Sequence, residues 1–206
     1  MKKLTAIVLL ISLYSSIGKS QQAKKNETPA FTIAPNGALV IKPSASSSSK
    51  DFDFMDGNWE QTNHKLKDRL VNSKEWIDFP AKLSFNKILN GIGNTDHFYA
   101  TIGGKSFEGF TLRLFNPQTR LWSIYWAASG AGVLEPEVVG SFNGNIGTFY
   151  GRDTEKGKNI IVQYKWDKTN PKDLKWSQAF SADEGKTWEW NWYMHEWPAG
   201  TKGKSK

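Results

Sequence analysis

Aromatic and β-branched residues recur in short segments along most of this chain, from Asp51 to Trp197. Gly, Asn, Asp and Pro interrupt these segments at intervals of roughly 8–15 residues, a spacing typical of antiparallel all-β folds. Only Asp51–Asp56 has the pattern of a helical turn. The pattern predicts ten strands, over residues 57–66, 76–89, 94–102, 107–116, 120–128, 137–143, 146–152, 158–167, 174–181 and 187–196.

The connections between these segments have the composition of tight reversals. Asn116-Pro117-Gln118-Thr119 places Pro at the second position of a turn, Asn143-Gly144 is typical of a type I′ hairpin, and Asn170-Pro171-Lys172-Asp173 is a third reversal. Ten strands joined in this way leave no exposed edges if the sheet closes on itself. We therefore predict an all-β fold, a ten-stranded antiparallel barrel.

Gly57-Asn58-Trp59 opens the first long strand directly after the predicted helical turn. This resembles the G-x-W start of calycins, which include lipocalins, fatty-acid-binding proteins and nitrobindin-like barrels. The resemblance implies that Trp59 packs at the closed end of the barrel. Residues 107–126, 136–142 and 176–194 further resemble an uncharacterised bacterial family of unknown function with a predicted lipocalin-like barrel. That resemblance implies a calycin-like fold for residues 51–197 and no particular reaction.

The N-terminal segment has the composition of a secretory signal peptide over residues 1–20. Lys2 and Lys3 precede a mainly apolar region of ten residues, Leu4–Leu13, and the small residues Gly18 and Ser20 would allow cleavage before Gln21. A region of ten residues is too short to span a bilayer, so we expect no stable membrane insertion. These features predict a periplasmic or secreted protein.

Residues 21–50 form a predicted N-terminal extension. Within it, residues 31–43 are expected to form a short hairpin around Pro35-Asn36-Gly37, and Ser44–Ser49 is expected to be a flexible linker. The barrel domain then covers residues 51–197, and residues 198–206 form a basic tail. The chain contains no cysteine, which excludes disulfides, thiolate catalysis and Cys-type metal sites.

The formal net charge of +7 comes from the two ends of the chain. Residues 51–197 hold 17 Lys and Arg against 19 Asp and Glu, a net charge of −2. A nucleic-acid-binding domain needs its basic patch on the folded surface. We therefore expect a small-molecule ligand and no nucleic-acid partner, and the sequence does not indicate an oligomeric state.

The segment from Ser181 to Trp188 matches the Asp-box pattern S-x-D-x-G-x-T-W. In such a hairpin the Asp side chain accepts backbone N–H bonds and Gly takes a positive φ. A single copy argues against a propeller, which would repeat it. We expect Asp183 to stabilise the hairpin and not to act in catalysis.

The last strand determines the candidate site, because its two faces differ in chemistry. Period two places Trp188, Trp190, Trp192 and Met194 on one face and Glu189, Asn191, Tyr193 and His195 on the other. Either face could line the lumen, and the family resemblance favours the polar one. With the matching faces of other strands, this interpretation gives a candidate ligand-binding set of Arg113, Trp126, Gln178, Glu189 and Asn191.

Three functions are compatible with these residues. The first is binding of a small amphiphilic or aromatic ligand in the lumen, with Gln178 directly opposite Asn191. The second is a cofactor-free isomerase, cyclase or hydrolase in which Glu189 is the general base and Arg113 holds an anionic group. The third is a carbohydrate-binding surface of Trp188, Trp190 and Trp192.

Metal and cofactor sites have little support in the sequence. His64, His97 and His195 lie on three different strands without the spacing of a zinc motif. Asp96 and His97 are adjacent in sequence, so their side chains point to opposite faces of a strand. An axial haem ligand at His195 is conceivable by analogy with nitrobindin-like barrels. We expect no metal and no cofactor, and the sequence identifies no catalytic residues.

Overall fold

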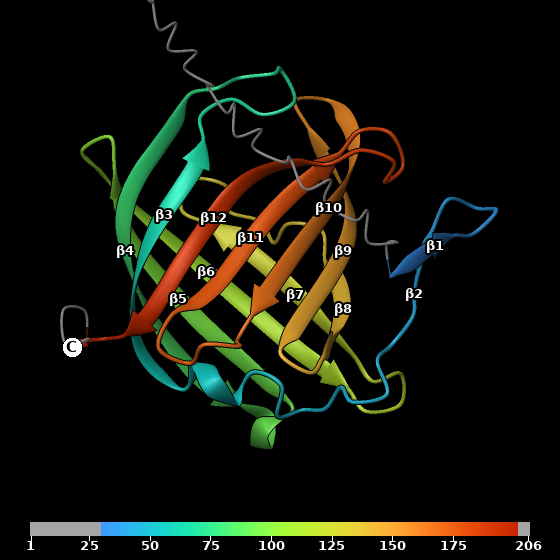
Figure 1. The fold of residues 1–206 in the computed structure, drawn as a ribbon, viewed down its shortest axis with the longest axis horizontal. Helices are drawn as coiled ribbons and strands as arrows, with labels where there is room; N and C mark the ends of the chain where they lie inside the picture. Colours follow the sequence, from blue (N-terminus) through green and yellow to red (C-terminus); the bar gives the residue numbers. More distant parts are fainter. Residues whose placement is uncertain (1–29, 202–206) are drawn as a thin grey trace, which may run out of the picture.

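The computed structural model describes residues 30–201 and contains a closed barrel of ten antiparallel strands, β3 to β12 (Figure 1). Each barrel strand pairs with its neighbours in sequence, and β12 pairs with β3 to close the sheet. The barrel strands are β3 (Gly57–Leu66), β4 (Trp76–Ile88), β5 (Gly93–Ile102), β6 (Lys105–Asn116), β7 (Leu121–Ala128), β8 (Val138–Asn143), β9 (Ile146–Glu155), β10 (Lys158–Asp167), β11 (Leu174–Ser181) and β12 (Glu189–Pro198). The predicted fold class and all ten predicted strands are confirmed.

The two ends of the barrel differ. The β3–β4, β7–β8 and β11–β12 connections surround one end, which we call the mouth. The 3₁₀ helix η1 (Asp53–Met55) lies at the other, closed end, together with η2 (Leu89–Gly91) (Figure 1). Along β3, every second side chain points into the barrel, from Trp59 at the closed end to Lys65 near the mouth.

Aromatic packing seals the closed end. The Phe52 ring meets the rings of Trp122 and Phe142 edge to face, with ring centroids 5.0 and 5.1 Å apart. Trp59 is buried, and its Nε1 donates a 2.8 Å hydrogen bond to the carbonyl of Met55. The packing role expected for Trp59 is therefore confirmed.

The serine stretch differs from the flexible linker that its composition predicts, because polar contacts hold it to the closed end. Ser47 is buried and its hydroxyl donates a 2.7 Å hydrogen bond to Asp51 Oδ2. Ser44 N donates to the Ser141 hydroxyl on β8 at 2.9 Å, and Arg120 donates to the carbonyl of Ser47 at 2.8 Å. The small size of serine lets this segment run close to the barrel.

The predicted N-terminal hairpin is present as β1 (Phe31–Ile33) and β2 (Leu39–Ile41). It packs on the outer side of β9, where Phe31 meets Tyr150 edge to face and Arg152 Nε donates to the carbonyl of Gly37 at 2.6 Å. The predicted signal peptide, residues 1–20, lies outside the described residues, as does most of the basic tail.

The Asp-box hairpin joins β11 to β12 as the sequence predicts. Asp183 accepts hydrogen bonds from Thr187 N at 2.9 Å and from the Thr187 hydroxyl at 2.6 Å, and Gly185 has a φ of +83°. These bonds, together with one from Ser181, lower the pKa of Asp183 to about 2. Asp183 thus has a structural role.

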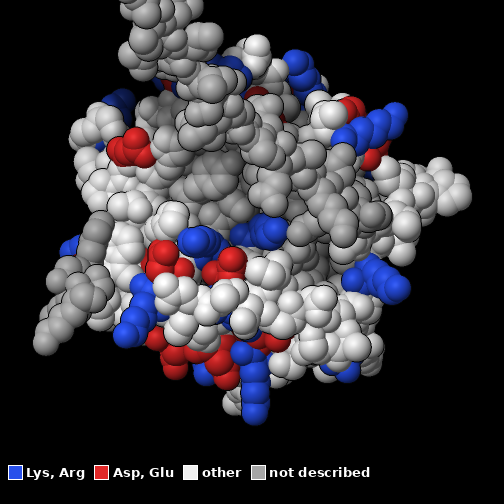
Figure 2. All heavy atoms as spheres, in the orientation of Figure 1, with Lys and Arg blue, Asp and Glu red and all other residues white. Residues whose placement is uncertain are grey.

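The visible part of the face shown in Figure 2 carries mixed charge, because its basic and acidic side chains lie next to one another. None of the helices within residues 30–201 has the length and hydropathy of a bilayer-spanning segment.

Candidate functional site

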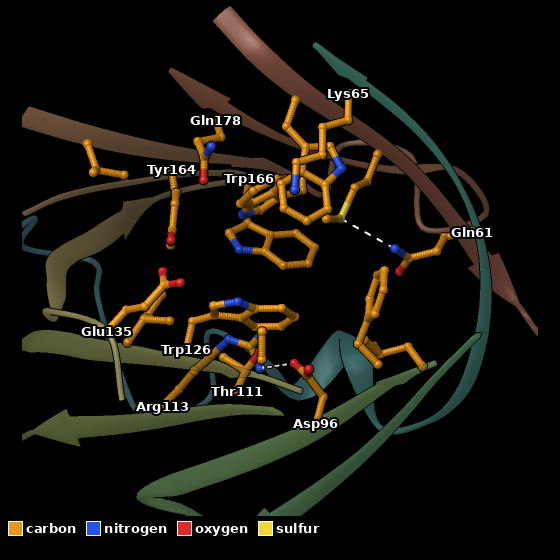
Figure 3. Close-up of a pocket in the computed structure, with 18 of the residues that line it drawn as sticks. Gln61, Lys65, Asp96, Thr111, Arg113, Trp126, Glu135, Tyr164, Trp166 and Gln178 are labelled. Carbon is orange, nitrogen blue, oxygen red and sulfur yellow. Dashed lines mark hydrogen bonds and ion pairs between the residues drawn. The ribbon is translucent and has the colours of Figure 1, made fainter. Parts of the chain in front are cut away.

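A cavity of about 310 Å³ lies inside the barrel, between the mouth and the aromatic closed end (Figure 3). Polar side chains reach it at two levels, one deep in the barrel and one near the mouth. The aromatic part of its wall consists of Phe98, Phe107, Trp126, Tyr164, Trp166, Trp176, Phe180 and Trp192. Such a combination of apolar walls with a few polar groups is typical of ligand sites.

The deep level centres on a buried ion pair. Arg113 Nη1 on β6 lies 2.6 Å from Asp96 Oδ2 on β5 and donates a 3.1 Å hydrogen bond to Asn94 Oδ1 (Figure 3). The guanidinium also lies 4.9 Å from the centroid of the Phe52 ring, which places it next to the closed end. Because Asp96 neutralises Arg113, the guanidinium presents no free positive charge to the cavity.

Glu196 on β12 is the second deep acid, and it is only 2% exposed. Burial, with a smaller contribution from Asp96, raises its pKa to about 8, and Arg113 opposes the shift. This raised pKa favours the protonated, neutral form of Glu196 at pH 7. Six buried side-chain atoms of the described residues have no hydrogen-bond partner: Gln61 Oε1, Asp96 Oδ1 and Oδ2, Arg113 Nε, Asn191 Nδ2 and Glu196 Oε2. Of these, Asp96 Oδ2 is in ion-pair contact with Arg113.

Charged side chains also surround the mouth. Lys65 Nζ lies 3.7 Å from the centroid of the Trp192 ring, and Arg69 Nη2 lies 3.3 Å from Glu155 Oε2. Figure 3 shows Glu135 and Tyr164 pointing toward one another across the cavity. Burial and the nearby Asp153 carboxylate raise the pKa of Glu135, and burial raises that of Tyr164.

Gly109 determines the position of the Trp126 indole in the cavity wall. A Cβ added to Gly109 on β6 would lie 1.9 Å from Trp126 Cη2, so the Trp126 ring occupies the space above the Gly109 backbone. The ring also meets Phe98 edge to face at 5.9 Å between centroids. These contacts keep Trp126 against the wall and leave the cavity open.

The structure brings together three of the five predicted site residues. Arg113, Trp126 and Gln178 line the cavity. Asn191 is fully buried, and its Oδ1 accepts a 2.8 Å hydrogen bond from Gln178 Nε2, although Asn191 is not part of the cavity lining. Whether any of them binds a ligand stays a prediction.

Glu189 lies apart from this group. Its Oε1 accepts a 2.8 Å hydrogen bond from Leu70 N in the β3–β4 connection, and it does not line the cavity. The structure therefore does not bring together the general base Glu189 and the anion-holding Arg113 that the enzyme alternative places in one lumen, because only Arg113 lines the cavity.

A β-bulge explains why the faces of the last strand were predicted incorrectly. Gln178 pairs with Trp192 and Ala179 pairs with Trp190, so Asn191 is the extra residue on β12. The bulge reverses the alternation, and Trp192, Met194 and Glu196 point into the cavity. The register that placed Gln178 directly opposite Asn191 is wrong, although their amides are in contact.

The bulge also places Tyr193 and His195 on the outside of the barrel, where both are exposed. His195 there contacts Asp173 at 2.9 Å, which rules out a role as a haem ligand in the lumen. Because Trp192 points inward, Trp188, Trp190 and Trp192 do not form a common outer platform for carbohydrate. Residues 30–201 contain no group of three or more His, Asp or Glu side chains arranged to hold a metal ion.

Of the charged residues that line the cavity, sequence reasoning found only Arg113. It missed Lys65, Arg69, Asp96, Glu135, Asp153, Glu155 and Glu196. The alternation of side chains along β5 did indicate an inward position for Asp96. Its side chain lies on the same face as that of Phe98 and points away from that of His97, as predicted. Lys65 follows Gln61 and Asn63 on the inward face of β3 in the same way. Because charged residues are rarely buried, the sequence alone gave little reason to place these side chains in the lumen.

Comparison with known proteins supports the fold. No family model matches the chain, and no curated protein sequence matches it either. Solved structures do match. One is the S-type phycobiliprotein lyase CPES from Guillardia theta, with 10% sequence identity, a TM-score of 0.51, and coverage of 79% of this chain and 96% of that chain. At this identity the likeness shows a shared calycin-like barrel fold.

Proposed function

We propose that this barrel binds a small, flat aromatic or amphiphilic molecule in its cavity. The observation that carries the proposal is that an aromatic-walled cavity is lined by residues with buried polar atoms that lack a hydrogen-bond partner, among them Gln61 Oε1, Arg113 Nε and Glu196 Oε2. Buried polar groups are almost always hydrogen-bonded in folded proteins. A ligand that carries both donors and acceptors, or water in its absence, would satisfy them.

The size of the cavity limits the ligand. About 310 Å³ lies at the small end of the range of roughly 300–1,000 Å³ that ligand pockets occupy. Indoles such as Trp126 and Trp192 offer stacking faces to a flat ring system. A fused bicyclic or tricyclic aromatic compound with polar ends fits this space.

The charge of the cavity favours a neutral or cationic ligand over an anion. Its lining contains three basic residues, Lys65, Arg69 and Arg113, and five acidic ones, Asp96, Glu135, Asp153, Glu155 and Glu196. With Glu196 protonated, the lining still has a net charge of about −1. The acidic side chains would repel an unpaired ligand carboxylate, and its charge would be costly to bury in the partly desolvated cavity.

Calorimetric titration with three matched naphthalenes tests the proposal. We expect 2-naphthalenemethanol and 2-naphthylmethylammonium to bind at least tenfold more tightly than 2-naphthoate. Trp126→Ala should weaken binding of the alcohol, because it removes a stacking face, whereas Trp190→Ala on the outer wall should not. Absence of heat with all three compounds, or tightest binding of the naphthoate, would contradict the proposal.

We further propose that the protein acts outside the cytoplasm, on the signal-peptide pattern of residues 1–20. Mass spectrometry of the protein recovered from cell fractions tests this point. A mature chain that begins at Gln21 in the periplasmic or extracellular fraction is expected, and a full-length cytoplasmic chain would contradict it.

A further inference from the structure

Lys65 differs from an ordinary surface lysine in its position. It is on the inward face of β3, directly opposite Trp192 of β12 in the strand register. Its Nζ lies 3.7 Å from the centroid of the Trp192 ring and forms part of the cavity wall near the mouth. Within residues 30–201, no carboxylate oxygen is in ion-pair contact with this amine.

These surroundings increase the fraction of the amine that is neutral and nucleophilic, although the ammonium form still predominates at pH 7. Burial is the main cause and the Arg69 guanidinium a second one, and together they lower the pKa of Lys65 to about 8, while Glu135 and Glu155 oppose the shift. Compared with an ordinary lysine pKa of 10.5, about 300 times more of the amine is neutral at pH 7.

We propose that Lys65 forms an imine with the carbonyl carbon of an aromatic or conjugated aldehyde held in the cavity. This inference rests on the proposed function and names the substrate class of the same site. Stacking against the indole of Trp192 would hold a flat aldehyde beside the amine. The surrounding aromatic wall would then protect the imine from hydrolysis.

The reaction needs no oxidant or reductant. The lone pair of Nζ attacks the carbonyl carbon, the C=O π bond opens, and one proton moves from nitrogen to oxygen to give a carbinolamine. The C–O bond then breaks, and the oxygen leaves as water after taking up a proton. The products are one protonated or neutral imine and one water molecule.

Acidic groups near Lys65 can supply and take back that proton. Glu135 belongs to the same cavity wall, and its raised pKa keeps part of it protonated closer to neutral pH. Asp153 and Glu155 on β9 and Tyr164 on β10 also face this part of the cavity, and Glu196 of β12 lies deeper. Glu155 is occupied by its contact with Arg69.

Trapping with 2-naphthaldehyde tests the inference. The protein is incubated with the aldehyde at pH 7, sodium cyanoborohydride reduces any imine to a stable secondary amine, and peptide mass spectrometry locates the adduct. We expect adduct formation on Lys65 to exceed that on any exposed lysine at least tenfold. The rate should rise with pH and reach half of its plateau near pH 8.

Two variants test the assignment of the adduct to Lys65. Lys65→Arg should lose the adduct, while Lys82→Arg on the outer wall should keep the adduct on Lys65. If the wild type binds 2-naphthalenemethanol but adducts are absent or spread over surface lysines, the imine inference is overturned and the binding function stands. If neither compound binds, both are overturned.

Discussion

The substitution Glu196→Gln removes an ionisable group that is buried beside Asp96 and keeps nearly the same shape. In the wild type, the pKa of Glu196 is raised from 4.5 to about 8 by burial. Between these two pH values the native state binds one proton more than the unfolded state, so the wild type loses stability as pH rises. Glutamine does not ionise, so the free energy of unfolding of the Glu196→Gln variant should lack this part of the pH dependence.

The magnitude follows from the size of the shift. At about 1.4 kcal/mol per pH unit, ionisation of the unfolded state costs the wild type about 3 kcal/mol at pH 7 and about 5 kcal/mol above pH 8. Glu196→Gln should therefore match the wild type near pH 4.5 and exceed its free energy of unfolding by up to about 3 kcal/mol at pH 7.

Urea denaturation followed by tryptophan fluorescence at half-unit intervals from pH 4.5 to 9 measures both profiles. The exposed Glu108 offers a matched control, since Glu108→Gln should leave the pH profile of the wild type unchanged. Parallel profiles for wild type and Glu196→Gln across this range would refute the reasoning that burial keeps Glu196 protonated.

Three further substitutions test other parts of the structure. Gly109→Ala should push the Trp126 ring into the cavity and weaken 2-naphthalenemethanol binding at least tenfold in calorimetry; unchanged affinity would contradict this packing. Asp183→Ala should lower the free energy of unfolding by about 2 kcal/mol with no effect on binding, and an affinity change would argue against a purely structural role. Asp96→Asn should cost about 3–5 kcal/mol by leaving the Arg113 charge buried alone, and adding Arg113→Met should recover most of it; a neutral single variant would be inconsistent with a buried ion pair.

Local sequence signals were sufficient for the barrel and for part of its interior. Alternation and turn residues act between neighbouring positions, so the ten strands, the Asp-box hairpin and the inward direction of Arg113, Trp126 and Gln178 followed from them. The position of Glu189 did not follow from local signals, because its carboxylate accepts a hydrogen bond from Leu70 N, which is distant in the sequence.

The bulge at Asn191 is the reason that the inward direction of Trp192, Met194 and Glu196 was missed. One extra residue reverses every side chain that follows it, and nothing in the local composition distinguishes a bulged strand from a regular one. The burial of Lys65 and Asp96 likewise depends on partners from other strands, such as Trp192 and Arg113. Such contacts between residues of different strands form only in the folded barrel.

A crystal structure of the protein with 2-naphthalenemethanol shows whether the cavity inside the barrel is a binding site. We expect density for the naphthalene ring inside the barrel, next to Trp126 and Trp192, with the hydroxyl group near the buried polar atoms of Gln61, Arg113 or Glu196. A lumen without the compound, with density only on the outer wall beside Trp190 and Tyr193, would contradict this expectation.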